Sequence, residues 1–213
     1  SHKDDELRAH AEYLLGNLAQ EYADLSKNEA SKKLMYQDAL ARFSKIPLDY
    51  PDAEFAPKAQ FKKALIYEKM GELDIAVEEY VKLAYKYPDH ELIPMVMSRL
   101  GAYFQKQGLA YKTQAEELEK KENDTHAAGE AIRLREAAVK EYLNAAQVFA
   151  KLQKRFSDDK LAGLAGLRSA QNFMRAGHFA TAVKGFQKVV DAEQYDGKTI
   201  RAQAIFWSGL SQE

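Results

Sequence analysis

The stretch FKKALIYEKMGELDIAVEEYVKLAYKYP, residues 61–88, contains the pattern that decides the fold. Each half places small, aliphatic and aromatic side chains on one face of a helix, at Phe61, Ala64, Leu65 and Tyr67 and at Ala76, Tyr80, Leu83 and Tyr87. Gly71 stands between the halves, where a helix end needs the positive φ that glycine adopts without steric cost. Pro88 ends the second helix, and Asp89 is placed to cap a following one. The stretch therefore predicts two helices that fold back on each other as a hairpin.

The landmarks of this hairpin return at constant spacing along the chain. Steps of four, three and five residues separate Ala76, Tyr80, Leu83 and Pro88, and they separate Ala39, Phe43, Ile46 and Pro51, and Ala145, Phe149, Leu152 and Ser157. The first two steps return at Ala182, Phe186 and Val189, and small first-helix residues precede these sets at Gly16, Ala64, Gly101 and Ala170. One hairpin cannot bury its own apolar face, so neighbouring copies should stack. The predicted fold class is all-α, a solenoid of about four and a half hairpins.

We expect a single domain over residues 1–213, with repeats at about 7–51, 53–88, 90–157, 160–193 and 199–213. Two repeats are longer than the others. Gly101 and Ala145 lie 44 residues apart where Ala64 and Ala76 lie 12 apart, an insertion of 32 residues, and the first repeat has an excess of 11. The composition of both insertions favours helices, each broken once by polar residues, near Asn28 and at 122–124.

The larger insertion predicts an extended antiparallel helical hairpin over about residues 105–144. Its two arms would meet in a coiled-coil seam, with Tyr103, Tyr111, Ala115 and Leu118 facing Ala131, Leu134, Ala138 and Tyr142. A charged disordered loop is the alternative, and it fits the segment AEELEKKENDTH better than the segment IRLREAAVKEYL.

Composition narrows the class of function. The formal net charge is −1, from 31 basic and 32 acidic residues, so no long-range field recruits nucleic acid or anionic membrane. The absence of cysteine excludes disulfides and thiolate metal sites. No apolar run approaches the roughly 20 residues that span a bilayer. Because the sequence stops inside an apolar helical pattern, we expect it to be part of a longer protein.

The residue pattern shows no catalytic, cofactor or metal site, and we expect the chain not to be an enzyme. The histidines at 2, 10, 90, 126 and 178 share no metal-ligand spacing, and no HExxH pair is present. The segment LAGLAGLRSA, residues 161–170, has glycines that match no phosphate-binding pattern, so close helix packing explains them better. Carboxylate pairs lie on charged helical faces, where solvation is the default.

The repeat resembles the tetratricopeptide repeat family. The resemblance rests on Ala64, Tyr67, Gly71, Ala76, Tyr80 and Pro88 in one copy and on Ala170, Phe173, Gly177, Ala182 and Phe186 in the fourth, whereas Ser157 departs from the proline of that pattern. It implies a right-handed superhelical solenoid. Residues 50–89 are similar to the bacterial cell-envelope branch, the outer-membrane assembly lipoproteins and periplasmic coordinators. That similarity implies a periplasmic or outer-membrane-associated scaffold for protein partners.

A solenoid of this kind holds peptides on the concave face that its first helices form. By register, the expected partner-binding residues are Asn17, Glu21, Leu65, Glu68, Lys69, Ala102, Gln105, Lys106, Gln171, Met174 and Arg175. The long hairpin is a second expected docking surface. The apolar end at Ile205, Phe206, Trp207 and Leu210 is a third, and it could support self-association. A cytosolic adaptor or chaperone partner, and the recruitment portion of a multidomain enzyme, are the alternative functions.

Overall fold

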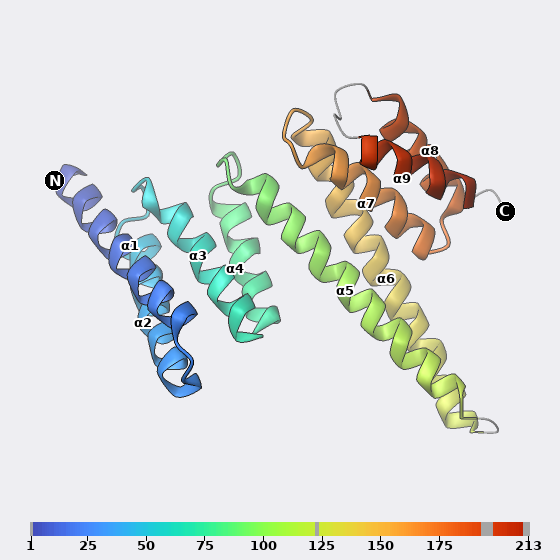
Figure 1. Ribbon diagram of the computed structural model, residues 1–213, viewed down its shortest axis with the longest axis horizontal. Helices are drawn as coiled ribbons and strands as arrows, with labels where there is room; N and C mark the ends of the chain where they lie inside the picture. Colours follow the sequence, from blue (N-terminus) through green and yellow to red (C-terminus); the bar gives the residue numbers. More distant parts are fainter. Residues whose placement is uncertain (1, 122–123, 193–197, 211–213) are drawn as a thin grey trace. The chain divides into compact units, whose positions relative to one another are not determined.

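The computed structural model describes residues 2–121, 124–192 and 198–210 (Figure 1). Over these residues the chain forms nine helices and no strand. The helices are α1 (His2–Leu25), α2 (Glu29–Asp49), α3 (Phe55–Met70), α4 (Leu73–Lys86), α5 (Ile93–Glu119), α6 (Thr125–Arg155), α7 (Ala162–Arg175), α8 (Phe179–Asp191) and α9 (Lys198–Leu210). The prediction of an all-α helical repeat fold is confirmed. The predicted break at 122–123 and the repeat ends at 193 and 211–213 lie outside the described residues.

The chain divides into two compact units, Ser1–Val96 and Met97–Glu213, and the boundary falls within α5. Unit 1 contains the hairpins α1–α2 and α3–α4, and unit 2 contains most of α5 with α6 to α9. The single domain and the handedness of the solenoid stay predictions.

Local signals fix the ends of several helices. Gly71 closes α3 at φ 82°, and the next amide, that of Glu72, donates back to the Tyr67 carbonyl at 2.9 Å. Gly177 follows α7 with the same left-handed geometry, at φ 80°. Asn28 caps α2, because its Oδ1 accepts from the Ser31 amide at 2.9 Å. The expectation that Asp89 caps the next helix is wrong, since α5 begins only at Ile93 and Asp89 lies in the connecting turn.

In unit 1, small residues of a first helix lie against aromatic residues of a second. A Cβ added to Gly16 in α1 would stand 2.7 Å from the fully buried Phe43 ring of α2. In the next hairpin, the Phe61 ring of α3 lies 5.7 Å from that of Tyr80 in α4, measured between centroids. The α1–α2 hairpin and α3 share one apolar core, which includes Ala39, Ile46, Ala56 and Ile66. The predicted pairing of a small residue with an aromatic one is therefore present in the first hairpin, and in the second hairpin two aromatic rings pack together.

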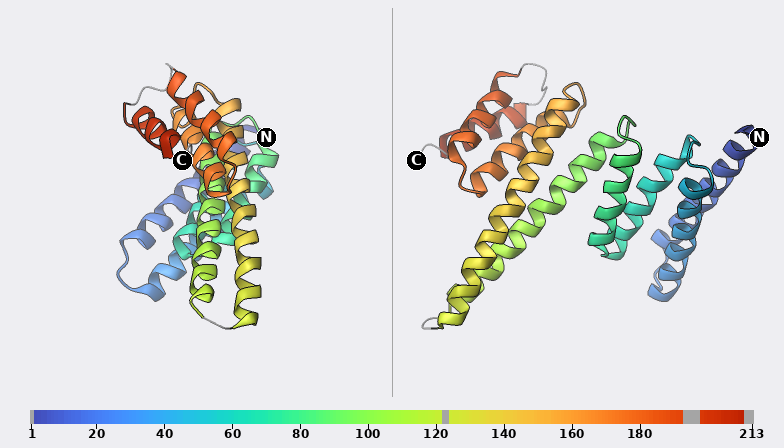
Figure 2. Two further views of the ribbon diagram at one scale, coloured as in Figure 1. Left: turned by 90° about the vertical axis from the view of Figure 1, so that its right-hand side faces the viewer. Right: turned by 180° about the vertical axis from the view of Figure 1, so that it is seen from behind.

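In unit 2, the two helices of the long hairpin keep one antiparallel register. Gly101 of α5 lies under Phe149 of α6, and Gly108, seven residues further along α5, lies under Tyr142, seven residues back along α6. Both views of Figure 2 show α5 and α6 side by side. Tyr111 packs on Ala138 and Tyr142, as the predicted seam requires. The structure therefore confirms an extended helical hairpin rather than a disordered loop.

The remaining helices of unit 2 close over a second core. This core combines side chains from α7, α8 and α9, namely Leu167, Ala170, Ala182, Phe186, Val189 and Ala204. In Figure 1 the outer half of the α5–α6 hairpin extends away from α7, α8 and α9. The long hairpin therefore has a base that packs against neighbours and an outer half that packs mainly on itself.

Candidate functional site: a groove beside the long hairpin

A groove of about 350 Å³ lies where the long hairpin meets the end of α7, within unit 2. We call it the hairpin groove. It is lined by Leu109 and Lys112 of α5, by Arg135, Ala138, Val139 and Tyr142 of α6, and by Arg175 of α7. It therefore joins one residue of the predicted concave face, Arg175, to the predicted second surface, the hairpin.

The floor of the hairpin groove is apolar. Ala138 and Tyr142 are both 3% exposed, while Leu109 and Val139 are 57% and 38% exposed at its edges. Tyr142 reaches its place because Gly108 opposite has no side chain. Burial raises the pKa of the Tyr142 phenol, and the Arg175 guanidinium, 6.0 Å from the ring centroid, opposes that rise. The ring is thus an uncharged platform for an apolar side chain.

Three cations surround this floor, and two of them are neutralised within the hairpin. Lys112 lies 3.6 Å from Glu116, and Arg135 donates two hydrogen bonds to Glu119, at 2.5 and 2.6 Å. Arg175 is exposed and has no carboxylate within salt-bridge distance among the described residues. A guanidinium can bind a carboxylate through two parallel hydrogen bonds. The hairpin groove therefore suits a peptide segment that combines one carboxylate with an aliphatic or aromatic side chain.

The other predicted residues of unit 2 have different environments. Gln105 is half-buried, and its Oε1 accepts from Asn172 Nδ2 of α7 at 3.1 Å, so its amide joins two helices. Met174 packs against the core of α7 to α9. Ala102 and Lys106 are exposed, and Gln171 is half-buried. Of these residues only Arg175 lines the hairpin groove.

In unit 1, the predicted residues lie on α1 and α3. The Lys69 ammonium of α3 forms an ion pair with Asp24 of α1, which brings these two first helices together. Glu21 is exposed, and Asn17, Leu65 and Glu68 are half-buried. The Oδ1 atom of Asn17 is buried and receives no hydrogen bond from the residues described. Lys69 thus has an internal partner, while Asn17 keeps an unused acceptor.

Sequence reasoning missed the carboxylate at the centre of this contact. Asp24 accepts a 2.5 Å hydrogen bond from the Tyr36 hydroxyl of α2 and pairs with Lys69 of α3. Burial alone would raise the pKa of Asp24, but the hydrogen bonds from Lys69, Tyr36 and Gln20 hold it below its ordinary value. Asp24 therefore joins three helices. In the sequence Asp24 is a polar residue on the exposed face of a helix, and nothing in that pattern indicated that it joins three helices.

A second buried carboxylate lies between α3 and α4. Glu79, 3% exposed, accepts hydrogen bonds from Gln60 and, at 2.8 Å, from Lys82, and it pairs with Lys63 at 3.1 Å. Burial would raise its pKa, yet Lys82 and Lys63 hold the pKa below its ordinary value. These groups line a pocket of about 440 Å³ with Leu48 and Tyr85. Because Glu79 is fully hydrogen-bonded, its role is structural.

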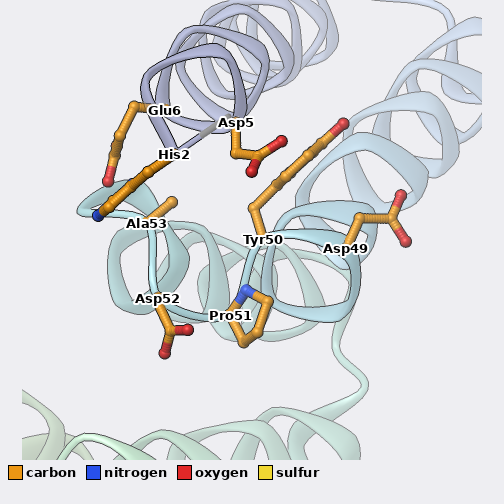
Figure 3. Close-up of a pocket in the computed structure, with 8 residues that line it drawn as sticks. All are labelled: His2, Asp5, Glu6, Asp49, Tyr50, Pro51, Asp52 and Ala53. Carbon is orange, nitrogen blue, oxygen red and sulfur yellow. The ribbon is translucent and has the colours of Figure 1, made fainter.

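A third pocket, of about 340 Å³, lies where the start of α1 meets the α2–α3 connection (Figure 3). Four of its eight lining residues are acidic, namely Asp5, Glu6, Asp49 and Asp52. Figure 3 shows the carboxylates of the three aspartates at separate places around the pocket. Over the described residues, no group of three His, Cys, Asp or Glu side chains is close enough to hold a metal ion.

The packed helical hairpins are those of a helical repeat protein, and the hairpin groove is large enough for a short peptide segment. Residues 58–90, which include most of α3 and all of α4, match the family model described as Tetratricopeptide repeat. Repeats of this family generally mediate protein–protein interaction. A search of curated proteins finds none that matches the chain. None of the described helices combines the length and the apolar character that crossing a membrane requires.

Proposed function

We propose that this chain is a non-catalytic scaffold that holds a segment of a partner protein in the hairpin groove. Arg175 carries the proposal, because it is an exposed cation beside an apolar floor and has no carboxylate within salt-bridge distance in the part of the chain that the structure describes. The partner segment is a short peptide with an acidic residue near an aliphatic or aromatic one. Its carboxylate pairs with Arg175, and its apolar side chain packs on Tyr142 between Leu109 and Val139.

The proposal extends to the compartment and to the kinds of partner. The scaffold works in the bacterial envelope, in the periplasm or at the outer membrane, as part of a lipoprotein or a periplasmic coordinator. The similarity of residues 50–89 to that branch supports this placement. The near-neutral charge supports protein rather than nucleic acid as the partner. The remaining predicted concave-face residues add contact surface within each unit by itself, and the apolar end of α9 is a separate surface that could support self-association.

Site-specific photo-crosslinking tests the groove. A benzophenone side chain at Val139, which is 38% exposed in the groove, should capture a defined protein from a bacterial envelope extract. The matched control is Val81, which is 51% exposed on α4 of unit 1 and should not capture that protein. Arg175→Glu should abolish the Val139 product, and Arg175→Lys should retain part of it.

A shortened chain gives the second arm of the test. Replacing residues 109–140 by a short turn removes most of the groove and should remove the captured protein from a pull-down. Retained capture by the shortened chain, or a Val139 product that Arg175→Glu leaves unchanged, would contradict the proposal. Capture from a cytosolic extract alone would contradict the envelope placement while leaving the groove intact.

A further inference from the structure

The turns that follow α2, α4 and α6 share one set of backbone hydrogen bonds. Each turn begins at the aromatic residue that ends the second helix of a hairpin, and the third residue after it donates its amide to the carbonyl of that aromatic residue, at 3.0–3.2 Å. These third residues are Ala53, His90 and Asp159. The carbonyl of each then accepts from the amide three residues further on, at 2.9 Å. The three positions are therefore equivalent in the repeat.

The side chains at the three equivalent positions differ in what they offer the next helix. Asp159 Oδ1 accepts a hydrogen bond from the Leu161 amide at 2.7 Å. His90 Nδ1 accepts from the Leu92 amide at 3.2 Å, which is the same contact in the turn between α4 and α5. Ala53 has a methyl group there and offers no acceptor. The same amide is thus held by a carboxylate in one turn and by an imidazole nitrogen in another.

Of these two acceptors, only an imidazole ordinarily changes its charge near neutral pH. Nδ1 accepts a hydrogen bond while it carries no proton, so the neutral ring of His90 has its proton on Nε2. A second proton would bind to Nδ1 and remove the acceptor of the Leu92 amide. It would also place a positive charge ahead of α5, where the helix N-terminus is itself partly positive and the first turn contains no acidic residue.

The surroundings of His90 favour the neutral ring. Burial is the largest effect, and it lowers the pKa of His90 below the ordinary value of about 6.5. Glu91 in the same turn and Glu54 before α3 act in the opposite direction, while Lys58 of α3 lowers the pKa further. Lys58 lies 2.5 Å from Glu54, which neutralises that carboxylate. The stabilisation by His90 is therefore complete above about pH 6.5, and it is lost as pH falls through the folded-state pKa.

We propose that His90 is an acid-sensitive cap for the start of α5. The neutral ring holds the Leu92 amide, and protonation releases this amide and loosens the first turn of the helix. Ile93 and Val96 are at most 1% exposed and hold the helix beyond that turn, so the opening is confined to its start. Because α5 continues from this turn into unit 2, mild acid loosens the segment that links the two units.

Amide hydrogen exchange of the full chain, resolved by residue and corrected for the intrinsic effect of pH, tests the proposal. Between pH 8 and pH 5 the protection of the Leu92 amide should fall about tenfold, in step with the titration of the His90 ring followed by NMR. His90→Asp supplies the acceptor that Asp159 supplies in the equivalent turn, and it should keep Leu92 protected at both pH values. His90→Ala should leave Leu92 weakly protected at both.

The reciprocal substitution in unit 2 is the matched control. In the parent chain the Leu161 amide should keep its protection between pH 8 and pH 5. Asp159→His should make the Leu161 amide sensitive to acid while Leu92 responds as in the parent. This variant therefore separates an effect of the imidazole from a general loss of stability in acid, which would reach both turns.

Two results would overturn the proposal. One is a Leu92 amide whose protection stays constant while the His90 ring of the parent titrates. The other is an equal loss of protection in His90→Asp and in the parent, which would assign the acid response to another group. The first result needs only the parent chain, so the test does not depend on the folding of a variant. No residue of the hairpin groove is changed, so the outcome is independent of the proposed function.

Discussion

The ring of Phe149 lies on the backbone of Gly101, so close that a Cβ there would stand 2.7 Å from the Cζ atom of the ring. Phe149 is 1% exposed and packs in a core with Ala145, Leu152 and Ala165. Gly101→Ala should therefore destabilise the chain by about 1–3 kcal/mol through overpacking, although alanine is the better helix former. Gly129→Ala, in open space on α6, should stabilise it by about 0.5–1 kcal/mol. Urea unfolding followed by circular dichroism measures both, and equal effects at the two glycines would contradict the packing seen here.

Glu79 should make the stability of unit 1 sensitive to acid. Its folded-state pKa lies below the ordinary value because Lys82 and Lys63 outweigh the effect of burial. The stabilisation is complete above the unfolded pKa of about 4.3, and it is lost as pH falls through that value toward the folded pKa. Glu79→Gln should cost roughly 2 kcal/mol at pH 7, and the variant should lose less stability than the parent on acidification.

The neighbouring Glu78 is the control for this prediction, since its side chain is 69% exposed. Glu78→Gln should keep the acid sensitivity of the parent. Thermal unfolding of the parent, Glu79→Gln and Glu78→Gln is measured between pH 7 and pH 3. If stability falls in parallel with pH in Glu79→Gln and in the parent, another carboxylate is responsible for the acid sensitivity.

The cap of α2 should depend on a side-chain acceptor at position 28. Asn28→Ala removes the 2.9 Å hydrogen bond to the Ser31 amide and should destabilise unit 1 by about 1 kcal/mol. Asn28→Asp keeps an acceptor at the helix N-terminus and should be close to neutral. Chemical unfolding distinguishes the two variants. An equal loss of stability in both would mean that position 28 does not stabilise unit 1 by capping α2.

The ion pair between Arg135 and Glu119 should contribute little to folding despite its two hydrogen bonds. The side chains are 47% and 41% exposed, so water and salt compete for both charges. A double-mutant cycle with Arg135→Gln and Glu119→Gln should give a small coupling at low salt and a still smaller one at 1 M sodium chloride. A coupling that salt leaves unchanged would indicate that the pair is shielded from solvent.

Much of the fold could be predicted because small and large side chains recur at fixed spacing in each repeat. That spacing indicates where two helices pack closely. The spacing of Gly16, Phe43, Gly101 and Phe149 in the sequence identified the close helix contacts, and Gly71 marked a real chain reversal. Helix-forming composition on both sides of a polar break identified the long hairpin. Each of these signals lies within a short stretch of sequence. Because a repeat protein is built from hairpins that pack on their neighbours, short stretches of sequence are enough to predict most of its fold.

The candidate site was harder to predict because it depends on which charges find partners. Arg175 and Lys69 look alike in the sequence as exposed cations at the ends of first helices. In the structure Lys69 pairs with Asp24, whereas Arg175 faces an apolar floor without a carboxylate among the described residues. Leu109 and Val139 are apolar residues at positions outside the seam of the hairpin, where polar residues are expected. These two positions were the one sequence signal of an apolar groove.

The outer half of the long hairpin, which packs mainly on itself, has a consequence for local opening. Its amide hydrogens should exchange with solvent sooner than those at the base, where Phe149 and Ala165 of α7 share a core. A ligand bound in the hairpin groove would add contacts at the point where the outer half joins the base. Occupancy should therefore slow amide exchange on both arms of the hairpin, including positions that the ligand does not touch.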